Sequence, residues 1–232
     1  MSLSLESSEQ RNSQNSDSID IKNAKVKTTP TSLSITTRTI KNDDFGNLGI
    51  NSWLIQALKS MSIKIPTEIQ VACIPKILEG KDCIGEAKTG SGKTAAFALP
   101  ILQKLSEDPF GIFALVLTPT RELAFQIADQ FKVLGKGINL KDCVIVGGLN
   151  MMDQALELSR KPHIVIATPG RLVDHINTDR LLSDTFSEDL EVIFDHIPSK
   201  RQTLLFTATM TENILALQDI EKEPGKKPFV YQ

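Results

Sequence analysis

A glycine-rich segment between a short apolar run and a helical pattern constrains this chain most. Residues 82–85 are predicted to form a strand, residues 87–94 read AKTGSGKT, and the helical run AAFALPILQKL follows directly. Glycines in such a turn let backbone amides approach a phosphate closely, and the start of the next helix adds a partial positive charge. This order of strand, glycine turn and helix predicts a loop that binds the phosphates of a nucleotide.

Several residues of the loop have an expected chemical role. Gly90 and Gly92 let the backbone approach a triphosphate, Lys93 supplies a positive charge to the β- and γ-phosphates, and the Thr94 hydroxyl is a ligand for Mg²⁺. The standard pattern of such loops begins with glycine, whereas this chain has Ala87. The predicted phosphate-binding residues are Ala87, Lys88, Thr89, Gly90, Ser91, Gly92, Lys93 and Thr94.

Short apolar runs alternate with helical patterns from residue 45 onward. Most of the predicted strands are continuous apolar runs, which is typical of parallel strands covered on both faces. They lie at residues 82–85, 114–118, 143–146, 164–168 and 203–207. Between them, Leu123, Ile127, Phe131 and Leu134 recur at helical spacing, and a further helix is predicted before Pro162. The alternation predicts an α/β fold with a doubly wound, mostly parallel sheet, in which ligands bind beyond the carboxyl ends of the strands.

Composition narrows the class of protein. The 26 Lys and Arg residues nearly balance the 28 Asp and Glu residues, so the net charge is −2 and a histone-like basic arm is not expected. The three cysteines are far apart and have no metal-ligand spacing, and no apolar run approaches the length of a membrane span. These features argue against zinc-dependent, secreted and membrane proteins. Almost half of residues 1–40 are Ser, Thr or Asn, so we expect a disordered polar tail there.

The segment 87–94 resembles motif I of the DEAD-box RNA helicases. Residues 65–70, with Phe45 upstream, resemble the Q motif of that family, although the family usually has glycine where Ser62 stands. The resemblance implies that the nucleotide is ATP, with Ile65 and Gln70 in the adenine site. A glutamine amide offers one donor side and one acceptor side to adenine, and an aromatic ring such as Phe45 can stack on the base.

Three further segments at predicted strand ends resemble RNA-binding motifs of the family. The PTRELA segment resembles motif Ia, a Gly-Gly pair follows the next strand, and TPGR resembles motif Ib. Backbone amides and arginines at such turns suit contacts with sugar and phosphate that do not read sequence. The implied RNA-binding residues are Pro119, Thr120, Arg121, Gly147, Gly148, Thr168, Pro169, Gly170 and Arg171. Thr207, Ala208 and Thr209 resemble the motif that couples ATP hydrolysis to unwinding.

The tetrapeptide Asp-Glu-Ala-Asp that names the family is absent. In the family its first Asp holds Mg²⁺ through water and its Glu activates the attacking water. Here Asp179, followed by Arg-Leu-Leu, resembles only the last residue of the motif, and a helix-capping role for Asp179 is the alternative. We estimate that roughly 14 residues, including one internal strand, are missing before it. The neighbours of that strand must re-pair across the gap or leave backbone groups unpaired.

The segment 190–197, an apolar run that superficially reads as a strand ending in the acidic residue Asp195, offers no substitute for the missing motif. Its apolar residues Leu190, Ile193, Phe194 and Ile197 fall at offsets of a helical face, whereas a buried strand would show no such period. We therefore expect a helix there. The chain ends shortly after residue 209, so we also expect the second RecA-like domain of the family to be absent.

Together, these features predict the amino-terminal RecA-like domain of an ATP-dependent RNA helicase, residues 41–232, which uses ATP and Mg²⁺. Several stretches, such as CIPKILEGKDCIG, resemble the nucleolar members that act in small-subunit ribosomal RNA maturation. That resemblance implies pre-ribosomal RNA, protein cofactors and a monomer in the nucleolus. We expect feeble nucleotide binding and no unwinding. A non-catalytic module that binds RNA or cofactors is the alternative, whereas a small kinase or GTPase is disfavoured because no Asn-Lys-x-Asp guanine signature exists.

Overall fold

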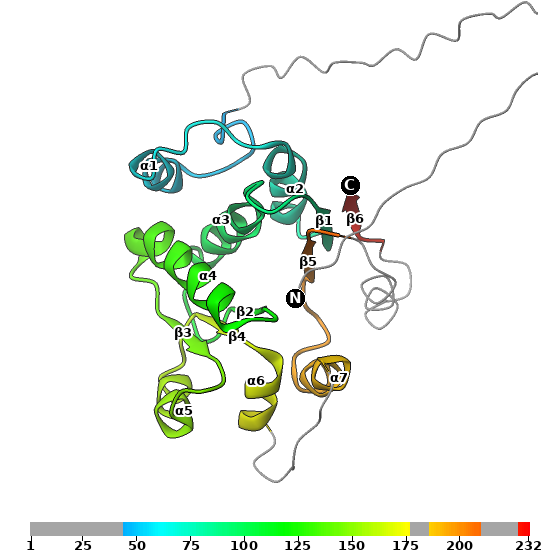
Figure 1. Cartoon of the computed structure of the whole chain (residues 1–232). Helices are drawn as coiled ribbons and strands as arrows, with labels where there is room; N and C mark the ends of the chain where they lie inside the picture. The colour runs from blue at the N-terminus through cyan, green and yellow to red at the C-terminus, as the bar shows by residue number, and fades with distance from the viewer. Residues whose placement is uncertain (1–43, 177–185, 210–226) are drawn as a thin grey trace, which may run out of the picture. The chain divides into compact units, whose positions relative to one another are not determined.

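The computed structural model describes residues 44–176, 186–209 and 227–232 (Figure 1). The predicted tail and Asp179 lie outside the described residues. All described residues belong to one compact unit. Its helical elements are α1 (Ser52–Ser60), α2 (Glu68–Leu78), α3 (Lys93–Leu105), α4 (Arg121–Leu134), the 3-10 turn η1 (Gly135–Ile138), α5 (Met151–Ser159), α6 (Pro169–Ile176) and α7 (Phe186–His196).

The strands form two separate three-stranded sheets, and every observed pairing is parallel. The first, which we call sheet A, has the order β5-β1-β6 and consists of β5 (Leu204–Thr207), β1 (Cys83–Glu86) and β6 (Phe229–Tyr231). The second, sheet B, has the order β2-β4-β3 and consists of β2 (Ala114–Leu117), β4 (Ile164–Ala167) and β3 (Asp142–Ile145). The described crossovers from β1 to β2, from β2 to β3 and from β3 to β4 each contain a helix, as parallel pairing requires.

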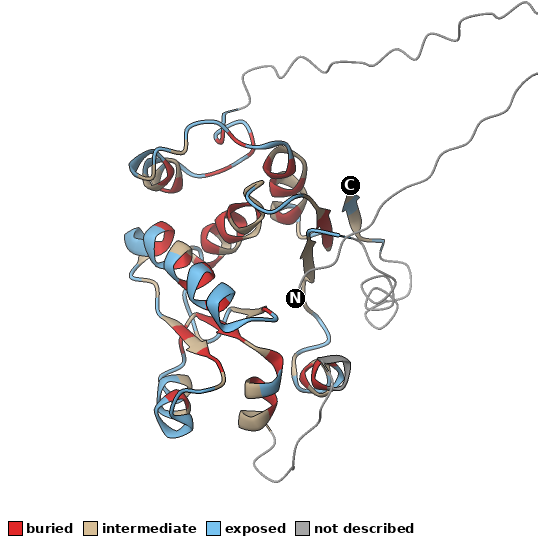
Figure 2. Cartoon of the chain, in the orientation of Figure 1, coloured by how far each residue is buried: buried red, intermediate tan, exposed pale blue. Residues whose placement is uncertain are grey.

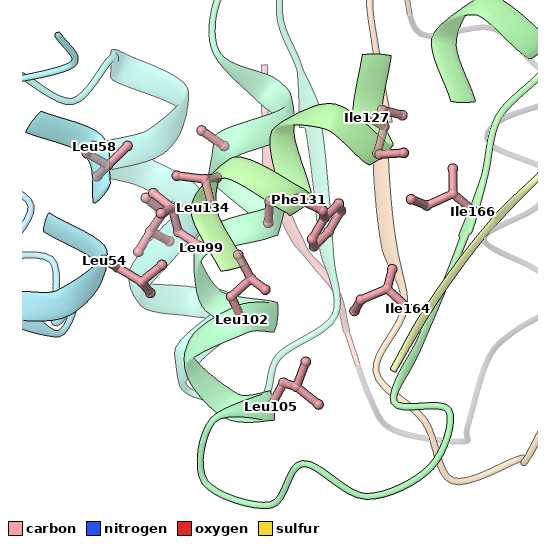
Figure 3. Packing of buried hydrophobic residues seen from close by; sticks show 14 of the residues in the cluster. Leu54, Leu58, Leu99, Leu102, Leu105, Ile127, Phe131, Leu134, Ile164 and Ile166 are labelled. Carbon is pink, nitrogen blue, oxygen red and sulfur yellow. The ribbon is translucent and has the colours of Figure 1, made fainter. Parts of the chain in front are cut away.

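The largest hydrophobic cluster joins α1, α3 and α4 to one face of sheet B. Figure 3 shows Leu102 of α3 and Phe131 of α4 on one side, with Ile164 and Ile166 of β4 on the other. All four side chains are completely buried. Burial of this apolar surface is the main term that stabilises the domain.

Two smaller clusters complete the packing. On the other face of sheet B, Val165 and Cys143 pack with residues of α6 and α7, including Leu172 and Ile193. Sheet A packs mainly against α2, through residues such as Ile69 and Cys83. Figure 2 shows the difference in burial: β1 is drawn mostly buried, whereas β5 is drawn as partly buried and β6 as partly buried to exposed.

The five strands predicted from the sequence are all present, each displaced by no more than about one residue at its ends, which is the usual uncertainty of strand and helix boundaries. The segment at 190–197 is helical, as its periodicity indicates, and forms most of α7. The short β6 was not predicted, because three residues are too few to give a periodic signal.

The predicted α/β fold, with parallel strands flanked by helices, is confirmed. Its strands form two sheets, because β5 and β2 do not pair with each other among the described residues. Of the two outcomes predicted for a missing internal strand, the structure therefore has the unpaired one. Re-pairing would require the helices packed on both sheets to move together, whereas open edges keep their packing intact.

Candidate nucleotide and RNA site

The predicted phosphate loop connects β1 to α3 at the carboxyl end of sheet A. Gly90 and Gly92 have φ angles of 80° and 88°, in the left-handed region that glycine adopts without strain. Gly92 is the N-cap of α3, and no side chain accepts a hydrogen bond from the first amides of that helix. The amides and the positive end of the helix dipole are therefore free to bind an anion.

Lys93 folds back over this loop. Its ammonium donates hydrogen bonds to the backbone carbonyls of Ala87 and Lys88, the second at 2.9 Å. Loss of solvent on partial burial lowers the pKa of the Lys93 ammonium from its ordinary value. A phosphate group would offer this ammonium a charged partner in place of two neutral carbonyls, and charge-assisted hydrogen bonds are stronger than neutral ones.

The loop also has a buried polar group without a partner and open space beside the exposed Gly90. The Ser91 hydroxyl is buried and has no hydrogen-bond partner, and no atom lies within 4 Å of the place where a side chain at Gly90 would begin. A buried hydroxyl without a partner is costly, so a phosphate oxygen at this point would satisfy it. These features fit the triphosphate of a nucleotide. Within 44–176, 186–209 and 227–232 no three His, Cys, Asp or Glu side chains gather into a metal site.

Gln70 lies next to this loop, where the sequence analysis expects the adenine site. Its side-chain oxygen accepts a hydrogen bond from the Thr67 amide at 3.0 Å, and its side-chain nitrogen donates to the Gly92 carbonyl at 3.0 Å. The side chain is 3% exposed. The glutamine therefore joins α2 to the phosphate loop, and its amide retains one further donor and acceptor position for a base.

Phe45 and Ile65 lie in contrasting environments. The Phe45 ring is 1% exposed and packs in the large core cluster, so it presents no open face for stacking on a base. Ile65, by contrast, is 73% exposed. The structure thus gives Phe45 a packing role in the core, which differs from the stacking role expected from the sequence.

The segment 207–209 is attached directly to the phosphate loop. The Ala87 amide donates to the Thr207 carbonyl at 3.1 Å, which continues the pairing of β1 with β5. The Thr207 hydroxyl donates to the Thr209 carbonyl at 2.7 Å and accepts from the Thr209 amide at 3.2 Å, so the turn is closed on itself. A shift of the backbone in the phosphate loop can therefore move residues 207–209, and the reverse, through this backbone hydrogen bond.

The predicted RNA-binding loops gather at the carboxyl end of sheet B. Thr120 caps α4 by accepting a hydrogen bond from the Leu123 amide at 3.3 Å. The Arg121 side chain then lies across Gly148, so closely that a side chain at position 148 would collide with its guanidinium. Gly148 has a φ of 79°, in the left-handed region that glycine adopts without strain, and it has no side chain to collide with the guanidinium. Next to it, Gly147 has open space around its α-carbon.

The third loop joins the same cluster. The Arg171 guanidinium donates to the Leu149 carbonyl at 2.9 Å and to the Asp174 carboxylate at 3.3 Å. The Thr168 amide donates to the Ile145 carbonyl at 3.0 Å, which places the start of α6 beside the end of β3. Two arginines thus converge on the turn at 147–149, a basic surface suited to phosphates. Pro169 and Gly170 form the first turn of α6.

Two residues that support this cluster were not singled out from the sequence. Gln154 is 5% exposed and donates to the Val146 carbonyl at 3.0 Å, which fixes the start of the Gly-Gly turn. Asn150 caps α5 by accepting from the Met152 amide at 2.9 Å. The asparagine before a helical pattern was a readable cap signal. No sequence signal indicated the buried role of Gln154, because a glutamine within a helix is ordinarily solvent-exposed.

Comparison with known proteins agrees with this geometry. The DEAD/DEAH box helicase family profile matches residues 67–217. The human protein named probable ATP-dependent RNA helicase DDX49 is 56% identical over 208 residues, a match that takes in 81% of this chain and 42% of the human protein. The Debaryomyces hansenii protein named ATP-dependent RNA helicase DBP8 is 56% identical over 211 residues, covering 81% of this chain and 48% of that protein.

A solved structure agrees as well. The crystal structure of a DEAD box protein from the hyperthermophile Methanococcus jannaschii aligns with a TM-score of 0.72 at 35% identity, over 81% of this chain and 55% of that one.

This chain spans about half the length of the relatives it matches. The human alignment of 208 residues is longer than the part of this chain that it includes, so the relative has residues within the matched region that this chain lacks. No described helix is long and apolar enough to cross a bilayer. On this evidence the chain belongs to the DEAD/DEAH box helicase family.

Proposed function

We propose that the described domain binds ATP at the phosphate loop and single-stranded RNA at the 119–121, 147–148 and 168–171 turns, as one half of an ATP-dependent RNA helicase. The observation that carries the ATP site is the uncapped start of α3 beside the buried, unpaired Ser91 hydroxyl. The relatives named as ATP-dependent RNA helicases support the choice of ATP and RNA as ligands.

In this proposal each residue of the loop has one task. The α3 amides and Ser91 hold the phosphates, Lys93 leaves the carbonyls of its own loop to contact the β- and γ-phosphates, and Thr94 is a ligand for Mg²⁺. Mg²⁺, when bound, neutralises charge on the phosphates. Gln70 recognises adenine with its free donor and acceptor positions, and the same side chain transmits base binding to the Gly92 carbonyl.

On the RNA side, Arg121, Arg171 and the amides of the three turns would contact the sugar-phosphate backbone without sequence preference. Thr207, Ala208 and Thr209 would couple the two sites. The substrate we propose is pre-ribosomal RNA, with pre-ribosomal protein cofactors and a nucleolar location, because stretches such as CIPKILEGKDCIG resemble the nucleolar members of the family.

We further propose that this chain binds ATP without efficient hydrolysis. The sequence has no Asp-Glu-Ala before Asp179, so the carboxylates that would hold the metal through water and activate the attacking water are missing. The site would therefore keep its ligand-binding amides and lose its general base.

The test is equilibrium binding of a fluorescent ATP analogue and of a fluorescent oligouridylate to the purified 232-residue chain. We expect Lys93→Ala to abolish saturable ATP binding and to leave RNA affinity within about twofold, because removing one phosphate contact typically costs a tenfold change or more while a distant site is unaffected. An Arg121→Ala variant should show the reverse pattern. Equal ATP affinity of the parent chain and Lys93→Ala would contradict the proposed nucleotide site.

A second candidate is a passive RNA-binding module, and the separation of the two sheets favours it. The ATP loop stands on sheet A and the RNA turns stand on sheet B, with no strand pairing between them among the described residues. RNA affinity that is unchanged by a saturating ATP analogue supports this candidate. RNA affinity that rises with the analogue supports coupling through residues 207–209.

A further inference from the structure

Two edge strands, β5 of sheet A and β2 of sheet B, each have one hydrogen-bonded neighbour among the described residues. In a parallel strand the N–H and C=O of one residue point to the same side, and successive residues alternate. The Thr203 carbonyl accepts a hydrogen bond from the amide of Cys83, the first residue of β1, and the Thr207 carbonyl accepts one from the amide of Ala87, which follows β1, at 3.1 Å each. The backbone groups of Leu204 and Phe206 therefore point away from β1, towards the free side of sheet A.

The same reasoning applies to β2. The amides of Ala114 and Thr118 donate to carbonyls that flank and end β4, at 3.2 Å and 3.0 Å. The backbone groups of Leu115 and Leu117 therefore point to the free side of sheet B. Among the described residues β2 pairs with β4 alone and β5 with β1 alone. Two rows of donors and acceptors are thus open, one on each sheet.

Side-chain packing shows that helices already cover the region on both faces. The Phe97 ring of α3 lies 5.4 Å from the Phe206 ring of sheet A and 6.2 Å from the Phe131 ring of α4, which packs on sheet B. On the opposite face, Leu115 and Leu117 pack in the cluster that contains Ile193 of α7. An added strand would place alternate side chains against these two apolar clusters.

The partial burial of the edge strands fits the same conclusion. All four residues of β2 and all four of β5 are only partly buried, whereas all four residues of the central β4 are buried. Parallel strands are ordinarily covered by neighbours on both sides, so β2 and β5 have the apolar composition of interior strands without a second neighbour. The human relative also has residues within the matched region that this chain lacks.

We propose that β5 and β2 together accept an extended apolar peptide segment from a partner protein, which inserts parallel to both strands and joins the two sheets. The segment would be rich in Val, Ile and Leu over about five residues, the usual length of a strand. Main-chain hydrogen bonds to Leu204, Phe206, Leu115 and Leu117 would provide affinity, as in other complexes formed by strand addition. The proposal does not depend on nucleotide or RNA binding.

The probe is a synthetic peptide with alternating valine and isoleucine at its centre and lysines at both ends. Amide hydrogen exchange of the full chain is measured with and without it. We expect exchange of the Leu115, Leu117, Leu204 and Phe206 amides to slow by about tenfold or more, because a new hydrogen bond protects an exposed amide. The amides of Val116 and Leu205, which point towards existing partners, serve as internal controls.

A second peptide has proline at two central positions, which removes N–H donors without removing apolar surface. We expect it to protect none of the four amides. Equal protection by both peptides would mean general hydrophobic adhesion and would overturn the proposal, as would no protection by either. Protection that rises with protein concentration in the absence of peptide would assign the edges to a second copy of this chain, and would likewise overturn it.

Discussion

Sheet A and sheet B carry the two predicted ligand sites on very different supports. β4 of sheet B is paired on both sides, packed on both faces and completely buried, and the RNA turns follow from its sheet. Sheet A carries the phosphate loop between two partly buried strands. The contrast indicates that a strand lost from the middle of a parallel sheet weakens mainly the half with fewer helices packed against it, here sheet A.

The largest effect on stability is expected from replacing two phenylalanines that contact the same ring, one on each sheet's side, and the difference between them tests this contrast. Phe131 and Phe206 both pack on Phe97, but Phe131 is fully buried whereas Phe206 is partly buried. We expect Phe131→Ala to lower the free energy of unfolding by about 3–5 kcal/mol, as other buried phenylalanines do. Phe206→Ala should cost less than half of that.

Urea denaturation followed by circular dichroism measures both losses. Phe125→Ala, on the same helix as Phe131 but with a side chain 42% exposed, is the matched control and should have little effect. Equal losses for Phe131→Ala and Phe206→Ala would mean that the two halves are equally well packed.

The turn at 147–148 gives a smaller effect confined to sheet B. At Gly148 an added methyl group meets both a φ of 79° and the Arg121 guanidinium. We expect Gly148→Ala to destabilise the domain by about 1–2 kcal/mol, the usual cost of a left-handed backbone with a side chain. It should also weaken RNA binding and leave ATP-analogue binding unchanged. Gly147→Ala, where nothing lies within 4 Å, is the control. A loss of ATP binding in Gly148→Ala would show that the two sites are not separate.

The cap of α4 should contribute less. Thr120→Ala removes the acceptor of the Leu123 amide, and we expect a loss of about 1 kcal/mol in thermal or urea unfolding. Thr120→Ser keeps a hydroxyl at the same place and should recover most of that loss. If both variants unfold alike, the hydroxyl has no capping role.

The smallest effect concerns pH. Burial lowers the pKa of the His175 imidazole below its ordinary value of 6.5, and the positive charge of Arg171 lowers it further. Because the folded state disfavours the charged form, the stability from this group is present above the unfolded pKa and is lost as pH falls through the folded pKa. We therefore expect the unfolding free energy to fall as pH drops below about 6.5. The fall should be shallower in His175→Gln, and identical pH profiles would contradict it.

Much of the fold was predictable because its signals are local. The apolar runs fixed the strands to within about one residue, the spacing of Leu190, Ile193 and Phe194 indicated a helix, and Thr120 and the glycine turn were readable from their residue types. The order in which distant strands pair has no local signal. The sequence indicated that a strand was missing, but only the structure showed two separate sheets.

The sites divide in the same way. The phosphate loop depends on a contiguous segment and was predictable, whereas the burial of Phe45 depends on α1, α3 and the core around it. The hydrogen bond from Arg171 to the Leu149 carbonyl joins residues from two loops, and Gln154 acts on a backbone carbonyl eight residues away. Such contacts follow from tertiary packing, which residue type alone does not specify.

The most direct test of the central claim is native-state hydrogen exchange of the full chain, resolved by strand. If the two sheets are separately paired, the free energy of the local opening that permits exchange will be lower for amides of β5 and β6 than for amides of β4. The amides of β5 and β6 will then exchange faster by about tenfold or more. Equal protection of β5 and β4 would mean that the strands form one continuous sheet in solution, and would contradict the account.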